Sequence, residues 1–159
     1  MSPELLAELS RLPLFPRTAR DLIRVAGLEG AAALITAWPG QEWPVPARVG
    51  GGNPFGVRRW AQLVEIVGEP AAGRIVRWSP GGVLCVPNLK EVRWSHTQDK
   101  IRADFDRLTL TNGYSLREAV FELGIKYGCT GAAIQRALKR PDNELGEAAA
   151  AAPVQWALF

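Results

Sequence analysis

The chain has 159 residues, 47% of them hydrophobic, so it can bury a core in one compact domain plus a small module, or in two small modules. No stretch reaches the apolar length of a membrane span, and an acid stands near the start where a signal sequence is basic; we expect no membrane partner and a cytoplasmic location. The net charge is +3, but residues 141–159 hold three acids and no base, which leaves +6 on residues 1–140 and a body suited to a polyanion.

Residue types that indicate catalysis or metal binding are sparse. Cys85 and Cys129 are isolated, and the single histidine, His96, has no ligand-type companion nearby. We expect both cysteines to be small buried apolar residues and His96 to lie at the surface or at a helix end. Because the acids are scattered and no nucleophile stands beside a base, we predict no enzymatic activity, no cofactor and no metal site.

The first residues are predicted to form helices. Ser2 and Pro3 suit the N-cap and first turn of a helix over residues 3–11, and Thr18 is expected to cap the next helix.

Residues 21–46 align with residues 62–87 without a gap, as an internal repeat of period 41. Each copy is predicted to be a helix ended by a glycine, a second helix, a Pro-Gly turn and a short strand stopped by proline. Residues 1–92 are therefore expected to form a duplicated helix-helix-strand module for assembly or dimerisation. The identical pairs are Leu22/Leu63, Gly27/Gly68, Ala31/Ala72, Pro39/Pro80, Gly40/Gly81, Val45/Val86 and Pro46/Pro87.

The predicted strands, about Gln41–Val45 and Gly82–Val86, are too short to stand alone and need partners. One hypothesis is that they pair antiparallel with each other about a pseudo-two-fold axis. The rival is that each pairs with its equivalent in a second chain, giving an isologous homodimer. Most of the tryptophans in or beside the repeats are expected in the core, namely Trp38, Trp43, Trp60, Trp78 and Trp94.

Two segments are interpreted as connectors. The glycine-rich residues 50–56 lack the Gly-Lys-Ser/Thr ending of a phosphate-binding loop, so we expect a flexible link between the copies. Residues 97–107 are predicted to form a helix that buries Ile101 and Phe105. Residues 108–114 are then read as a loop, because an Asn-Gly pair marks a turn.

Residues 115–140 are predicted to form two short helices joined at Gly128, an arrangement that can put the second helix into a DNA groove. Ser115 and Glu118 form a capping box, Gly128 can take the left-handed conformation that ends the first helix, and Thr130 suits the N-cap of the second. The residues expected to be buried are Leu116, Val120, Leu123 and Tyr127 in the first helix, and Ala133 or Ile134, Ala137 and Leu138 in the second.

The outer side of the second helix has the chemistry of a DNA-reading face. Arg and Lys pair with phosphate or guanine, and Gln bridges an adenine edge. The alternative is an ordinary helical hairpin with a solvated basic face. The residues expected to contact double-stranded DNA are Thr130, Gly131, Ala132, Gln135, Arg136, Lys139 and Arg140, with Arg117 and Lys126 positioning phosphates.

Residues 12–46, echoed by 62–87, together with IRADF at 101–105 and ELGIKYGCTGAAIQRALKR at 122–140, resemble the Mor (middle operon regulator) transcription activators of Mu-like phages. The resemblance implies an N-terminal dimerisation region joined to a helix-turn-helix. It also implies that this motif binds promoter DNA and helps host RNA polymerase to start transcription.

Carried over by position, residues 130–140 correspond to the recognition helix of that family and residues 118–127 to its supporting helix. The second helix departs from the family by starting Gly-Ala-Ala, where its members carry polar or basic residues, which leaves a thymine methyl contact by alanine as the main base readout. The expected fold is thus mainly α with short β-strands: a duplicated N-terminal module, a helix-turn-helix DNA-binding domain at 97–140, and an acidic, then apolar tail at 141–159.

Two classes of function stay open. The first is a phage-type DNA-binding transcription regulator, expected to form a homodimer and to contact host RNA polymerase or another host protein. The second is a phage-encoded protein-interaction module, an inhibitor or adaptor of a host protein, that kept the Mor-like frame and lost sequence-specific DNA reading. The tail either anchors on the body or on a partner through Trp156 and Phe159, or is a functionless extension.

Overall fold

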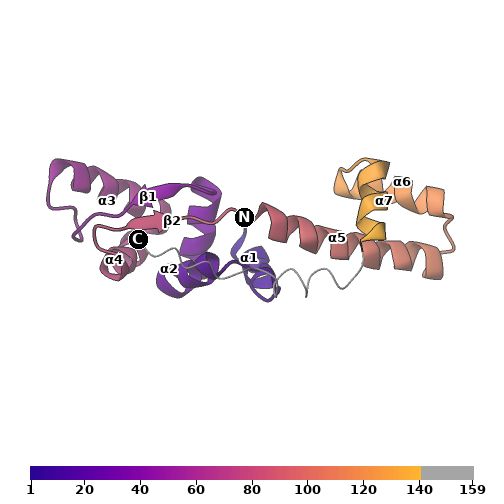
Figure 1. The fold of residues 1–159 in the computed structure, drawn as a ribbon, viewed down its shortest axis with the longest axis horizontal. Helices are drawn as coiled ribbons and strands as arrows, with labels where there is room; N and C mark the ends of the chain where they lie inside the picture. Colours follow the sequence, from indigo (N-terminus) through magenta and orange to yellow (C-terminus); the bar gives the residue numbers. More distant parts are fainter. Residues whose placement is uncertain (141–159) are drawn as a thin grey trace, which may run out of the picture. The chain divides into compact units, whose positions relative to one another are not determined.

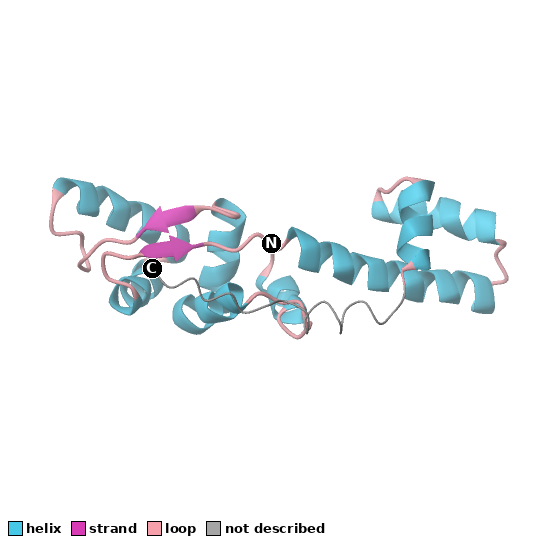
Figure 2. Cartoon of the chain, viewed as in Figure 1, coloured by secondary structure: helices cyan, strands magenta, loops and turns pink. Residues whose placement is uncertain are grey.

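A computed structural model describes residues 1–140 (Figure 1). These residues are mainly helical with one two-stranded sheet, so the predicted mainly α fold with short strands is confirmed at this level (Figure 2). The chain divides into two compact units, Met1–Glu91 (unit 1) and a second that begins at Val92 (unit 2). Within residues 1–140 no helix combines the length and apolarity needed to cross a membrane. The predicted tail at 141–159 lies outside the described residues.

Helix α1 (Pro3–Leu9) starts as predicted, with Ser2 as its N-cap accepting a hydrogen bond from a backbone N–H of the first turn. Helix α2 (Arg17–Ala37) starts directly after Pro16, so the prediction that Thr18 caps it is wrong. Pro16 occupies the N-cap position, with an extended backbone and ψ at 141°, so Thr18 lies within the first turn of the helix.

Two glycines break the helices of unit 1 at equivalent places of the sequence repeat. Gly27 interrupts α2 with φ at 81°, and Gly68, with φ at 78°, separates α3 (Pro54–Val67) from α4 (Glu69–Trp78). Glycine adopts such positive φ values at little cost, whereas other residues are strained there. Each copy therefore has a helix ended by a glycine and a second helix after it.

Arg74 of α4 binds the carbonyl groups that the break in α2 leaves open. Its Nε donates to the Val25 carbonyl at 2.9 Å and its Nη2 to the Ala26 carbonyl at 3.0 Å. A helix end leaves carbonyls without intrahelical partners, and a guanidinium can satisfy two of them at once. The two copies of the repeat are thus joined by hydrogen bonds between residues 48 and 49 positions apart.

Helix α3 starts earlier than predicted. The Asn53 side chain caps it by accepting from the Gly56 N–H at 2.7 Å, and Pro54 occupies the first turn. The interpretation of residues 50–56 as a flexible link is therefore wrong for its second half, because the Asn-Pro start signal outweighs the glycines. Gly51 is buried against this first turn.

Strands β1 (Glu42–Pro44) and β2 (Val83–Cys85) pair antiparallel within the chain, with Trp43 opposite Leu84. This is the first of the two pairing hypotheses. Each strand is shorter than predicted by one residue at either end, but the ladder continues beyond them, since the Val45 N–H donates to the carbonyl of residue 82 at 2.8 Å.

The buried core of unit 1 is aliphatic, and the expectation that most tryptophans belong to it is wrong. Trp38, Trp43 and Trp60 are half-buried, while Trp78 and Trp94 are exposed. The helices cross through small residues: a Cβ placed on Gly30 would lie 3.6 Å from the Ala71 Cβ, which leaves no room for an indole ring. Cys85, expected to be buried, is exposed as well, because it points outward from β2. The largest fully buried side chains here are Leu6, Leu9, Leu22, Leu34, Leu63, Ile75 and Val76.

Unit 2 is built on α5 (Lys90–Asp106), which starts seven residues before the helix predicted at 97–107. Asn88 turns the chain just before this start, because its side-chain oxygen accepts from the Lys90 N–H at 3.1 Å. Part of the predicted loop at 108–114 is a π-helical turn, η1 (Arg107–Thr111), that continues α5. Helices α6 (Leu116–Tyr127) and α7 (Gly131–Lys139) follow.

Candidate nucleic-acid interface

Helices α6 and α7 have ends fixed by local hydrogen bonds. Glu118 Oε2 accepts from the Ser115 N–H at 2.9 Å, and Ser115 Oγ accepts from the Glu118 N–H at 3.4 Å, which is the predicted capping box. The hydrogen bonds from the Ser115 side chain and backbone hold the pKa of Glu118 below its ordinary value. Gly128, with φ at 62°, ends α6, and Thr130 Oγ1 accepts from the Ala133 N–H at 3.3 Å to start α7.

A small apolar core holds both helices on α5. Leu123 of α6 and Ile134 and Ala137 of α7 are buried around Ile101 of α5. Leu116, predicted to be buried with them, is 61% exposed, because it lies in the first turn of α6 and the buried residues of that helix start one turn later. The remaining core members are Val120 and, partly buried, Phe105, Leu108, Tyr127, Cys129 and Leu138.

One side of α7 faces solvent and carries four of the nine predicted contact residues. Helical periodicity places Ala132, Gln135, Arg136 and Lys139 opposite the buried residues of the helix, and all four are exposed. Arg136 lies along the helix, with its Nε donating to the Ala132 carbonyl at 3.3 Å. Thr130 and Gly131, also exposed, lie at the N-terminal end of the same helix. We call residues 132, 135, 136 and 139 the outer face of α7.

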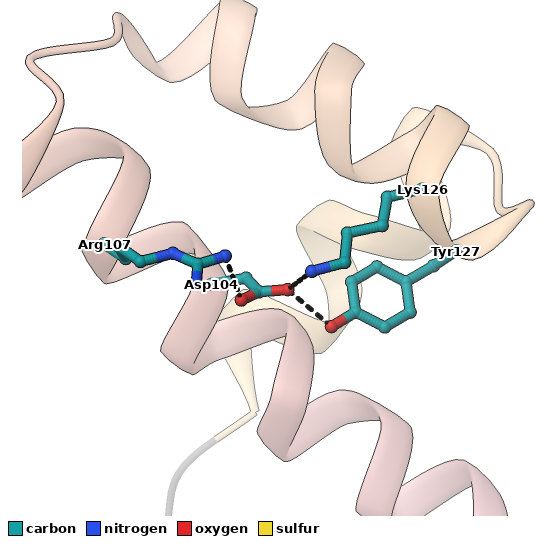
Figure 3. A network of polar contacts seen from close by, with 4 residues as sticks. All are labelled: Asp104, Arg107, Lys126 and Tyr127. Atoms are coloured by element: carbon teal, nitrogen blue, oxygen red, sulfur yellow. Dashed lines mark hydrogen bonds and ion pairs between the residues drawn. The ribbon is translucent and has the colours of Figure 1, made fainter.

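Lys126 lies at the end of α6 and binds to α5 (Figure 3). Its Nζ pairs with Asp104 Oδ2, which also accepts from the Tyr127 hydroxyl at 2.7 Å, while Arg107 pairs with Oδ1 at 2.7 Å. One carboxylate of α5 thus gathers two side chains from α6 and one from η1. In this structure Lys126 joins two helices, and the predicted phosphate-positioning role is not evident from its contacts.

The Asp104 network shifts two pKa values in opposite directions. The hydrogen bond from Lys126, then that from Tyr127, lower the pKa of Asp104 from its ordinary value. Burial, followed by the bond to the Asp104 carboxylate, raises the pKa of Tyr127 to about 12. Both shifts favour the ionised carboxylate and the neutral phenol, which is the pairing that the structure shows.

The C-terminal end of α7 is tied to α5 by two further contacts. Arg140 Nη1 donates to the Gln98 side chain at 2.7 Å, and Arg102 Nε donates to the Ala137 carbonyl at 3.0 Å. The second bond satisfies a carbonyl of the last turn of α7. Arg140, predicted to contact DNA, is half-buried and binds to α5, because it is the C-cap residue of α7 and its extended backbone, with ψ at 124°, no longer follows the helical period.

Arg117, the last predicted contact residue, borders an apolar groove on the other side of α6. We call this groove, about 450 Å³ in volume, the α6 groove. Its walls include Phe121 and Ile125, which are 65% and 66% exposed. Neither residue was predicted to form a surface site. The two lie four residues apart on α6, off the predicted buried side, and this spacing indicates a second apolar stripe. The other lining residues are Val120, Gly124, Cys129 and Gly131.

Residues 1–140 contain no group of three or more His, Cys, Asp or Glu side chains close enough together to hold a metal ion. The predicted absence of catalysis stays a prediction.

A comparison with models of known protein families gave no match, and neither the curated proteins nor the solved structures gave a significant one. The likeness to the Mor activators therefore rests on the quoted motifs alone.

Proposed function

We propose that this chain is a DNA-binding transcription regulator of the Mor-like kind, in which α6 and α7 form the helix-turn-helix and α7 enters the major groove. The observation that carries the proposal is the outer face of α7, where Gln135, Arg136 and Lys139 project from one side of a helix anchored on its other side. Amide, guanidinium and ammonium groups on a single rigid face suit base edges and phosphates.

The contacts that hold the helices on α5 support this assignment as much as the exposed side chains of α7 do. Arg140 and Arg102 tie the C-terminal end of α7 to α5, and Lys126 ties the end of α6 to the same helix. A helix that contacts base edges must be held rigidly, because a displaced side chain loses its bidentate hydrogen bonds to the base. The number of cations left for DNA is small, which favours two copies of the chain acting together on neighbouring half-sites.

Unit 1 is, in this proposal, a duplicated assembly module with a pseudo-two-fold axis between its copies. The equivalent breaks at Gly27 and Gly68 and the antiparallel pairing of β1 with β2 support it. Since β1 and β2 pair with each other, the strand pairing itself requires no second chain.

The test is the salt dependence of binding to duplex DNA, measured by fluorescence anisotropy between about 50 and 200 mM salt. Each phosphate contact contributes about −0.9 to the slope of log affinity against log salt, so Arg136→Ala with Lys139→Ala should flatten the slope by about 2. The matched control is Arg24→Ala, which removes an exposed arginine of unit 1 and should leave the slope unchanged. No binding by the unaltered chain at low salt would refute the proposal.

A second candidate function is favoured by one observation, the exposed Phe121 and Ile125 of the α6 groove. Apolar side chains gathered on a surface indicate a protein partner. In this alternative the chain is an inhibitor or adaptor that uses a helix-turn-helix frame without reading DNA. It predicts that Phe121→Ser abolishes binding to the partner protein, and that Arg136→Ala with Lys139→Ala leaves this binding unchanged.

A further inference from the structure

The α6 groove is an apolar site without an assigned occupant. Phe121 and Ile125 are its exposed apolar members, and two of its other lining residues, Gly124 and Gly131, have no side chain. The groove has a volume of about 450 Å³ and is open to solvent. Arg117 places a positive charge at the border. The groove thus suits an apolar segment accompanied by negative charge.

We propose that the occupant is this chain's own segment 141–159, with its apolar residues in the α6 groove. The segment contains three acids and no Lys or Arg, and it continues into Pro153-Val-Gln-Trp-Ala-Leu-Phe159. An indole and two other large apolar side chains within four residues match an apolar groove.

The connection is long enough. The described chain ends at Arg140, directly after α7, and Gly131 of the groove lies at the opposite end of that helix. A nine-residue helix is about 14 Å long, at 1.5 Å per residue. The residues between Arg140 and Trp156 would span roughly 20 Å as a flexible coil, which covers this distance. A tether of this length gives an effective concentration of about 1 mM.

The charges favour a path of the docked segment along the outer face of α7. Asp142, Glu144 and Glu147 come between Arg140 and the apolar residues in the sequence, and the exposed face of α7 carries Arg136 and Lys139. Opposite charges attract when they come close together. Docking would therefore cover the cations assigned to DNA, so the segment acts as an internal competitor. This consequence, unlike the docking itself, rests on the proposed function.

Cys129 gives a direct readout, because it is a half-buried thiol in the lining of the groove. In the full chain with Cys85→Ser, its alkylation by iodoacetamide is followed by mass spectrometry. With about 1 mM effective concentration and a groove affinity near 0.1 mM, docking should slow the reaction about tenfold. Trp156→Ala should restore the fast rate, and the matched control Gln155→Ala should not.

Phe121→Ser, which changes the groove at an exposed position, should also restore the fast rate and add nothing to Trp156→Ala. Equal rates with and without Trp156→Ala would overturn the proposal. Protection that disappears on dilution would overturn it too, since the occupant would then be a second copy.

DNA binding separates the two proposals. If docking covers α7, Trp156→Ala should tighten DNA binding by the same factor by which it speeds alkylation. Protection of Cys129 in a chain that binds no DNA would leave the docking intact and refute the proposed function. If the chain binds DNA but Trp156→Ala does not change the rate of alkylation, the proposed function stands and the docking is refuted.

Discussion

Replacing Asp104 with asparagine tests whether one carboxylate holds α6 on α5. Asparagine keeps the shape and an acceptor oxygen but removes the charge. The Tyr127 hydroxyl bond, made to a charged group at 2.7 Å, should lose about 1 kcal/mol. The pair with Lys126, whose side chain is 54% exposed, should lose less than about 1 kcal/mol, and the exposed Arg107 pair a few tenths. We expect unit 2 to be destabilised by about 2 kcal/mol.

The assay is urea denaturation followed by circular dichroism, with amide hydrogen exchange of α6 to assign the change to unit 2. The control is Asp106→Asn, an exposed neighbour on the same helix, which should change the free energy of unfolding by less than about 0.5 kcal/mol. A double-mutant cycle with Tyr127→Phe should give a coupling of about 1 kcal/mol. A loss below about 0.5 kcal/mol for Asp104→Asn would refute the argument.

The pH dependence follows from the two pKa shifts. Folding lowers the pKa of Asp104, so its contribution is present above the ordinary value of 3.8 and is lost as the pH falls through the folded value. The difference between the unaltered chain and Asp104→Asn should vanish in acid. Folding raises the pKa of Tyr127, so its contribution is complete below 10.0 and is lost as the pH rises toward about 12. Tyr127→Phe should remove that alkaline loss.

Two further substitutions test unit 1. Arg74→Ala removes both bonds to the carbonyls at the break in α2 and should cost about 1 to 2 kcal/mol in urea denaturation, while the exposed neighbour Arg77→Ala should cost less than half of that; equal effects would contradict the capping role. Gly51→Ala should cost about 3 kcal/mol or more, because its Cβ would collide with the backbone of residues 56 and 57 at a φ of 102°; Gly50→Ala, with open space around it, should cost only about 1 kcal/mol, and a similar loss for both would show that the collision is relieved.

The sequence by itself determined several features that depend on neighbours within four residues, although the predicted cap at Thr18 is wrong and the local cap at Asn53 was not predicted. The cap at Ser2, the capping box at Ser115, the left-handed Gly128 and the cap at Thr130 all appear as predicted, because each is a bond between a side chain and the nearest turn or a conformation open to one residue. The same locality made the outer face of α7 predictable, since helical period alone separates it from Ile134 and Ala137.

Tertiary structure decided which charges are available on that surface. The sequence predicts Lys126 and Arg140 to be exposed cations available to DNA, yet they bind partners on α5 that are 22 and 42 residues away along the chain. Leu116 follows the buried period and is exposed, while Phe121 leaves it and forms a groove wall. These outcomes depend on where one helix crosses another and how far its first turn extends past the core, and neither quantity is encoded in the period of a single helix.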